Sequence, residues 1–142
     1  MKKKLLPVFV ITILLMACKK ENATATSTNP IMEMVDTTAQ LKYRGAFMSG
    51  PYGTTMGTIK IYSKLNVYSM VLDSFTVSNG PDLHVYLSKE IQPLNFIDLG
   101  VLRATSGTQV YAINGTPDFS QFKYGLIHCQ QFDHLFGSAS LQ

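Results

Sequence analysis

Apolar and polar side chains alternate with a period of two in several segments, and this feature most restricts the fold. The alternating runs are rich in β-branched and aromatic residues, as half-buried strands are. They cover residues 59–62, 65–72, 82–88 and 122–129, and turn signals lie between them at Gly50-Pro51, Asn79-Gly80-Pro81, Ser106-Gly107 and Asn114–Pro117. No helical periodicity separates the runs, which excludes a doubly wound α/β fold. The pattern predicts roughly seven to nine strands in an all-β, antiparallel β-sandwich.

Residues 1–17 have the organisation of a secretory signal peptide, with Lys2–Lys4 before an apolar run from Leu5 to Ala17. A helix of that length spans about 20 Å, less than the roughly 30 Å hydrocarbon core of a bilayer, so the run is too short for a transmembrane helix. The junction Leu15-Met16-Ala17-Cys18 resembles a bacterial lipobox, whose cysteine is lipidated and becomes the mature N-terminus. We therefore expect a lipid anchor on Cys18. An ordinary signal peptide, with Cys18 there by chance, is the alternative.

The predicted anchor places the mature chain in a bacterial cell envelope, outside the cytoplasm. Lys19 follows the cysteine, where many inner-membrane lipoproteins carry aspartate, and this favours the outer membrane or the cell surface. Residues 18–41 are predicted to be the lipidated cysteine and a tether, polar and threonine-rich over 19–29. Within it, residues 31–41 form either a short turn of helix or an extended lead-in. One β-sandwich domain then covers residues 42–142.

Removing the signal peptide changes both the charge and the cysteine content. The formal net charge of +3 comes from Lys2–Lys4, since residues 18–142 carry nine Lys/Arg and nine Asp/Glu. A neutral domain without a basic patch excludes nucleic-acid binding. With Cys18 acylated, Cys129 cannot form an internal disulfide. A free thiol outside the cytoplasm is either hidden from oxidants or used for its reactivity.

Few other residues can carry chemistry. The chain lacks the nucleophile elbow, the phosphate-binding glycine loop, and the zincin and haem-attachment motifs, so a redox or binding module is favoured over an independent enzyme. Asp82 and Asp98 lie in strand-like segments with nothing to pair them, and turn capping is their default role. His84, Cys129 and His134 supply the two histidines and one thiolate of a blue-copper site, although no axial methionine follows His134.

Cys129 ends the last alternating run, on the face opposite Phe122, Tyr124 and Leu126. If those side chains fill the core, Cys129 points away from it or toward its rim. A single cysteine in a strand is ordinarily a small buried hydrophobe. The neighbouring His128 and His134 leave open a reactive thiolate or a ligand.

Several short motifs follow one another in an order that resembles a known family. They are Gly57-Thr58-Ile59, Leu72-x-x-Phe75, the segment Gly80–Ser88, Asp98-Leu99-Gly100, Gly107-x-x-x-Tyr111 and the segment Leu126–Leu141. Together they resemble the DM-thirteen domain, also called the electron transfer DM domain, a relative of the DOMON β-sandwiches. The resemblance extends over about residues 43–141.

This resemblance implies a redox module in which Cys129 is the characteristic residue. Cys129 would be a free redox thiol or an axial ligand of a prosthetic group such as haem, with His84, His128 and His134 as further ligand candidates. Many members carry a histidine shortly before the glycine that matches Gly57. This chain has Thr54-Thr55-Met56 there, so either Met56 substitutes or the copy is degenerate and haem is disfavoured.

The leading hypothesis is thus a membrane-anchored extracytoplasmic lipoprotein that transfers electrons through Cys129 to or from a redox or protein partner. The alternative is a non-catalytic binding or structural lipoprotein in which Cys129 is a core residue. A copper-binding sandwich is the third hypothesis. Haem, copper and the absence of any prosthetic group all remain open.

Overall fold

The computed structural model describes residues 26–142, so the predicted signal peptide and Cys18 lie outside the described residues. Regular structure in this part of the chain is entirely β, which confirms the predicted fold class. The nine strands are β1 (Ile31–Met32), β2 (Gln40–Ser49), β3 (Thr55–Lys64), β4 (Val67–Val77), β5 (Leu83–Ser88), β6 (Phe96–Val101), β7 (Ser106–Ile113), β8 (Tyr124–Cys129) and β9 (His134–Ser140). Residues 26–142 contain no helix able to span a membrane.

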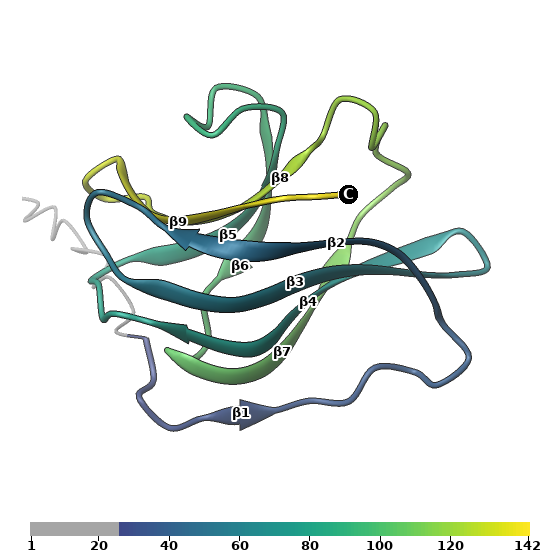
Figure 1. Cartoon of the computed structure of the whole chain (residues 1–142), viewed down its shortest axis with the longest axis horizontal. Helices are drawn as coiled ribbons and strands as arrows, with labels where there is room; N and C mark the ends of the chain where they lie inside the picture. Colours follow the sequence, from purple (N-terminus) through teal and green to yellow (C-terminus); the bar gives the residue numbers. More distant parts are fainter. Residues whose placement is uncertain (1–25) are drawn as a thin grey trace, which may run out of the picture.

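The strands form one sheet that curls over on itself into a sandwich-like shape (Figure 1), in the order β1-β7-β4-β3-β2-β9-β8-β5-β6. Every neighbouring pair is antiparallel except β1 and β7, which are parallel. Strand β2 belongs to both halves of the sandwich. Its first part pairs with β3, and residues Phe47–Ser49 pair with β9. The sheet therefore turns its corner within β2.

An apolar core fills the space between the two halves. Its fully buried members include Ile59, Ile61, Met70 and Leu72 from one half and Leu83, Val85, Leu87 and Ile127 from the other. Gly125 on β8 permits this close packing, because a Cβ at that position would overlap the Cδ1 atom of Ile59. Burial of apolar surface between the halves is the main stabilising contribution to such a fold.

Two turn assignments differ from the sequence prediction. Leu65 was expected within an alternating strand, but Leu65 and Asn66 have φ of 50° and 63° and form the two-residue turn of the β3–β4 hairpin. Ser106-Gly107 was expected to be a turn, but it begins β7. Gly107 has φ of 106°, and a Cβ there would overlap the backbone of Ile31, so glycine lets β1 lie against β7.

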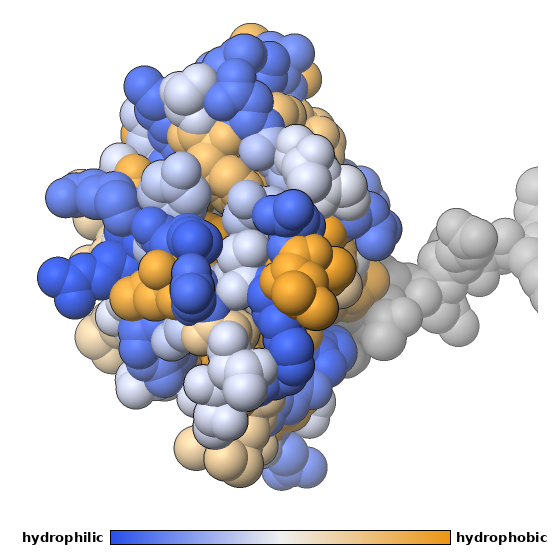
Figure 2. All heavy atoms as spheres, turned by 90° about the vertical axis from the view of Figure 1, so that its right-hand side faces the viewer, coloured by the Kyte–Doolittle hydropathy of each residue, from blue (hydrophilic) through white to orange (hydrophobic). Residues whose placement is uncertain are grey.

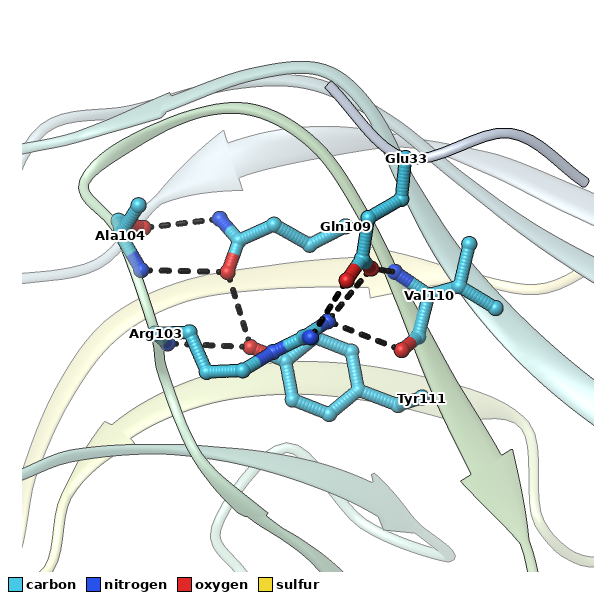
Figure 3. Close-up of polar contacts among 6 residues, drawn as sticks. All are labelled: Glu33, Arg103, Ala104, Gln109, Val110 and Tyr111. Carbon is cyan, nitrogen blue, oxygen red and sulfur yellow. Dashed lines mark hydrogen bonds and ion pairs between the residues drawn. The ribbon is translucent and has the colours of Figure 1, made fainter. Parts of the chain in front are cut away.

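Residues 31–41 form an extended lead-in rather than a turn of helix. Packed structure begins before residue 42, because Ser27 bridges Ala104 and β1 pairs with β7. A polar network next to β1 fixes its position (Figure 3). The Glu33 carboxylate accepts hydrogen bonds from both terminal nitrogens of Arg103 and from the backbone N–H of Val110, all at 2.6 Å.

Candidate functional site at Cys129

Strands β5 and β8 place the candidate side chains on two opposite faces of the sheet. In their antiparallel register, Leu83 lies opposite Cys129 and His84 lies opposite His128. Successive residues of a strand point to opposite faces. Cys129 therefore points to one side of the sheet, while His84 and His128 both point to the other.

The side chain of Cys129 faces the core. It is 1% exposed, is not disulfide-bonded, and belongs to the main core cluster with Leu83 and Ile127. Tyr124 and Leu126 instead pack in a smaller cluster on the outer face. The expectation that Cys129 points away from the core is wrong, because Tyr124 and Leu126 cover the outside of the sheet and only Phe122 packs against the main core. Lys123 is exposed and precedes β8.

On the outer face, His84 lies between two carboxylates. Its Nδ1 atom is 2.9 Å from Oδ2 of Asp98 on β6, and its Nε2 atom is 3.4 Å from Oδ1 of Asp82. Neither aspartate has a partner that could be recognised from the sequence. Only the pairing of β5 with β6, and the start of β5 directly after Asp82, bring them to the same imidazole.

His128 is the most deeply buried histidine of the site. It is 3% exposed, and neither ring nitrogen has a hydrogen-bond partner, although Oδ1 of Asp133 lies 3.3 Å from Nε2. Burial lowers the pKa of His128, so its ring is predominantly neutral at pH 7.

The aromatic ring of Tyr86 stacks between Phe96 and His128, with centroid distances of 4.2 Å and 5.5 Å. Burial raises the pKa of Tyr86 to about 12, so the phenol stays protonated at physiological pH. Neither Tyr86 nor Phe96 was predicted from the sequence to be a site residue. The outer face of β5 and β8 thus carries an aromatic layer next to His84 and its two carboxylates, over the strand that carries Cys129.

His134 is paired with Cys129 in the β8–β9 ladder, but its ring lies at the surface. The imidazole stacks on Tyr52, with ring centroids 3.6 Å apart and an interplanar angle of 3°. Phe132, in the turn after Cys129, contacts the same imidazole. Tyr52 lies in a loop far from His134 in sequence, and no local pattern predicts this stack.

These positions decide whether one prosthetic group can be held by Cys129 and the histidines. Cys129 is enclosed by core side chains, His84 lies on the other face, and His134 is stacked at the surface. Met56, the proposed substitute ligand, is exposed on β3. Residues 26–142 contain no cluster of three or more His, Cys, Asp or Glu able to hold a metal ion. The residues present do not fit haem or copper ligated by Cys129.

Comparison with known proteins assigns the family. A family model described as Electron transfer DM13 matches residues 46–141. No match is found among curated proteins or among solved structures. The matched segment contains Cys129 and all three histidines, covers the fold from within β2 to the end of β9, and leaves out β1. The chain therefore belongs to the Electron transfer DM13 family.

Proposed function

We propose that the chain is a lipid-anchored electron-transfer protein of the bacterial cell envelope and that the Cys129 thiol is its redox group. Family membership supports the electron-transfer class. The assignment to Cys129 rests on one observation: this free thiol is the last residue of β8 and directly precedes an exposed turn, residues 130–133. It is the only cysteine of residues 26–142.

The position of Cys129 offers a route to solvent that does not require global unfolding. All four residues of the turn are exposed, and Asp133 adopts a left-handed φ of 54°. Exposed turns at strand ends open at lower free energy than central strands. Fraying of the end of the β8–β9 hairpin would uncover the thiol while the two halves of the sandwich stay packed.

The chemistry that suits a lone thiol is exchange with a disulfide of a partner protein. The Cys129 thiol loses its proton, and the thiolate attacks one sulfur of that disulfide. A mixed disulfide forms, and the other partner sulfur leaves as a thiolate. Cys129 is thereby oxidised and the partner sulfur reduced. A thiolate of a second, reducing protein then attacks the partner's sulfur in the mixed disulfide, a disulfide forms between the two proteins, and Cys129 leaves as a thiolate. Two electrons have then passed from the thiol of the second protein to the disulfide of the first.

Mixed-disulfide formation tests this role. The full chain carrying Cys18→Ser has Cys129 as its only thiol. Incubated with oxidised glutathione under native conditions, it should gain one glutathione by mass spectrometry. At high concentrations of oxidised glutathione, the rate of this modification should become independent of the glutathione concentration, because opening of the β8–β9 hairpin then limits the reaction. The same chain with Cys129→Ala should gain nothing. If Cys129 reacts only in denaturant, the redox role is wrong.

The same experiment addresses the rival function, a non-catalytic binding or structural lipoprotein. One observation favours that rival: the Cys129 side chain is 1% exposed among apolar core residues, as a purely structural cysteine is. A thiol that is inert under native conditions, in a chain that remains folded, would leave the rival as the better account.

Lipid attachment has a separate test. When the natural chain is expressed in a bacterium grown with a clickable fatty acid, the mature protein should incorporate the fatty acid and fractionate with membranes. Cys18→Ser should abolish both properties, because it removes the predicted acylated sulfur. Label that persists in Cys18→Ser would refute the anchor at this position. Cys129→Ser, which removes the other thiol, is the matched control and should keep the label.

A further inference from the structure

We infer that the outward side of β1, together with the β3–β4 turn, is a surface that contacts the lipid bilayer. This surface, called here the β1 face, consists of Met32, Met34, Leu65 and Val67, all exposed apolar residues. The inference rests on the proposed lipid anchor. It adds to that anchor a defined orientation of the domain on the membrane.

Met32, at the end of β1, and Met34, just after it, point outward because Glu33 between them is held inward. Glu33 receives hydrogen bonds from Arg103 and from Val110 on β7 (Figure 3). Its own N–H donates to the carbonyl of Thr108 at 2.9 Å. Side chains alternate along an extended strand, so Met32 and Met34 point away from the domain. They are 77% and 88% exposed. Exposed apolar side chains that gather on one surface mark sites of contact with a membrane or another protein.

The β3–β4 turn extends this apolar surface. Leu65 is 91% exposed, and it lines a shallow apolar hollow of about 360 Å³ together with Met34, Val35 and Val67. Figure 2 views the end of the molecule at which this hairpin turns and shows apolar patches set among polar side chains. Lys64 and Asp36 form an ion pair at the border of the hollow, so the apolar surface has a polar rim without net charge.

The length of the chain before β1 makes the bilayer the natural occupant. Thr26, where the described chain begins, is only eight positions after Cys18. Fully extended, that segment reaches about 28 Å, at roughly 3.5 Å per residue. An acylated Cys18 thus keeps β1, five residues further on, within reach of the headgroups. Amphipathic helices bury their apolar face about 5–10 Å into the interface, and we expect the side chains of the β1 face to reach a similar depth.

Tryptophan quenching tests this orientation, because the chain has no tryptophan of its own. The mature lipidated protein carrying Met34→Trp is reconstituted into vesicles of phosphatidylethanolamine and phosphatidylglycerol, with or without bromine in the acyl chains. Brominated lipids should lower its emission by at least about twofold, since the indole lies at the acyl boundary. Leu94→Trp is the matched control. Leu94 is similarly exposed, but it lies in the β5–β6 loop on the opposite side of the molecule from β1, and the emission of this variant should not change.

Each other outcome overturns the inference in a recognisable way. If the protein is lipidated and bound to vesicles but the Met34→Trp variant is quenched no more than the Leu94→Trp variant, the anchor stands and the orientation is wrong. A second copy covers the β1 face instead if two results are found for the Met34→Trp variant: its emission in detergent depends on protein concentration, and its emission in vesicles is the same with and without brominated lipids. If the purified protein carries no acyl mass and remains in the soluble fraction, the anchor fails and the inference fails with it.

Discussion

At the residue scale, two neighbours in the chain, His128 and Cys129, have opposite surroundings. Cys129 lies in the apolar core, whereas His128 lies under the aromatic layer of the outer face. Both are almost completely buried, yet only the histidine carries ring nitrogens that need a hydrogen-bond partner. They have none among residues 26–142, and the nearby carboxylate of Asp133, 3.3 Å from Nε2, is itself exposed. Such a histidine destabilises the folded state as soon as it takes up a proton.

Stability should therefore fall as the pH decreases below about 6.5, the ordinary histidine pKa. In the unfolded chain, His128 binds a proton near pH 6.5, whereas in the folded chain it binds one only at a lower pH, because burial lowers its pKa. Between these two pH values the unfolded chain binds more protons, so a decrease in pH favours unfolding. Urea midpoints at pH 7.5 and pH 5 measure the effect. His128→Phe, which keeps a ring against Tyr86, should show a smaller pH dependence. If the stability of His128→Phe depends on pH as strongly as that of the natural chain, other titratable groups cause the pH dependence.

Cys129 makes a second prediction at this scale. Cys129→Ser should destabilise the fold by about 1–3 kcal/mol, because a hydroxyl without a partner replaces a weakly polar thiol in the core. Cys129→Ala should cost less, since it removes only one atom of packing and buries no new polar group. Urea unfolding of both variants in the Cys18→Ser background measures the difference. Equal losses would indicate that the site is more polar than its neighbours suggest.

At the scale of elements, β1 is held mainly by the side chain of Glu33 and by its short parallel pairing with β7. Glu33→Ala should leave the sandwich folded and change its global stability by less than about 1 kcal/mol, because the ion pair with Arg103 is partly exposed. The amide protons of β1 should exchange several-fold faster, by hydrogen–deuterium exchange, as the strand detaches more often.

A matched control for this substitution is Glu90→Ala. Glu90 caps the β5–β6 loop through Asn95 and has no contact with β1. Its loss should leave the exchange of β1 unchanged. If amide exchange in β1 becomes faster in both variants, the cause is a general loss of stability of the domain and not the loss of the Glu33 contacts.

At the scale of the whole molecule, one continuous sheet forms both halves of the sandwich, with β2 common to both. The two halves should therefore unfold together in a single transition. Val67→Trp on β4 and Phe96→Trp on β6 report on the separate halves, and their urea midpoints, each compared with the circular dichroism of the same variant, should coincide. A tryptophan transition that precedes the loss of β signal would contradict this cooperativity.

Much of this architecture could be predicted from local pattern. Period-two alternation and turn signals are properties of a few consecutive residues, and they correctly indicated an all-β fold and located four of its nine strands, β3, β4, β5 and β8. Leu65 and Gly107 were misassigned because apolar character and glycine both occur in strands and in turns. Only the pairing of β3 with β4, and of β1 with β7, decides between the two roles.

The sequence by itself determined the class of fold, the family, and which residues could carry chemistry. It could not determine which face of a strand is inside, since β5 and β8 are covered on both faces and alternation then gives no contrast in burial. Tertiary structure alone put Cys129 in the core, set His84 between two aspartates and stacked His134 on Tyr52. The physical reason is that these contacts join strands distant in sequence, and only the folded sheet register brings them together.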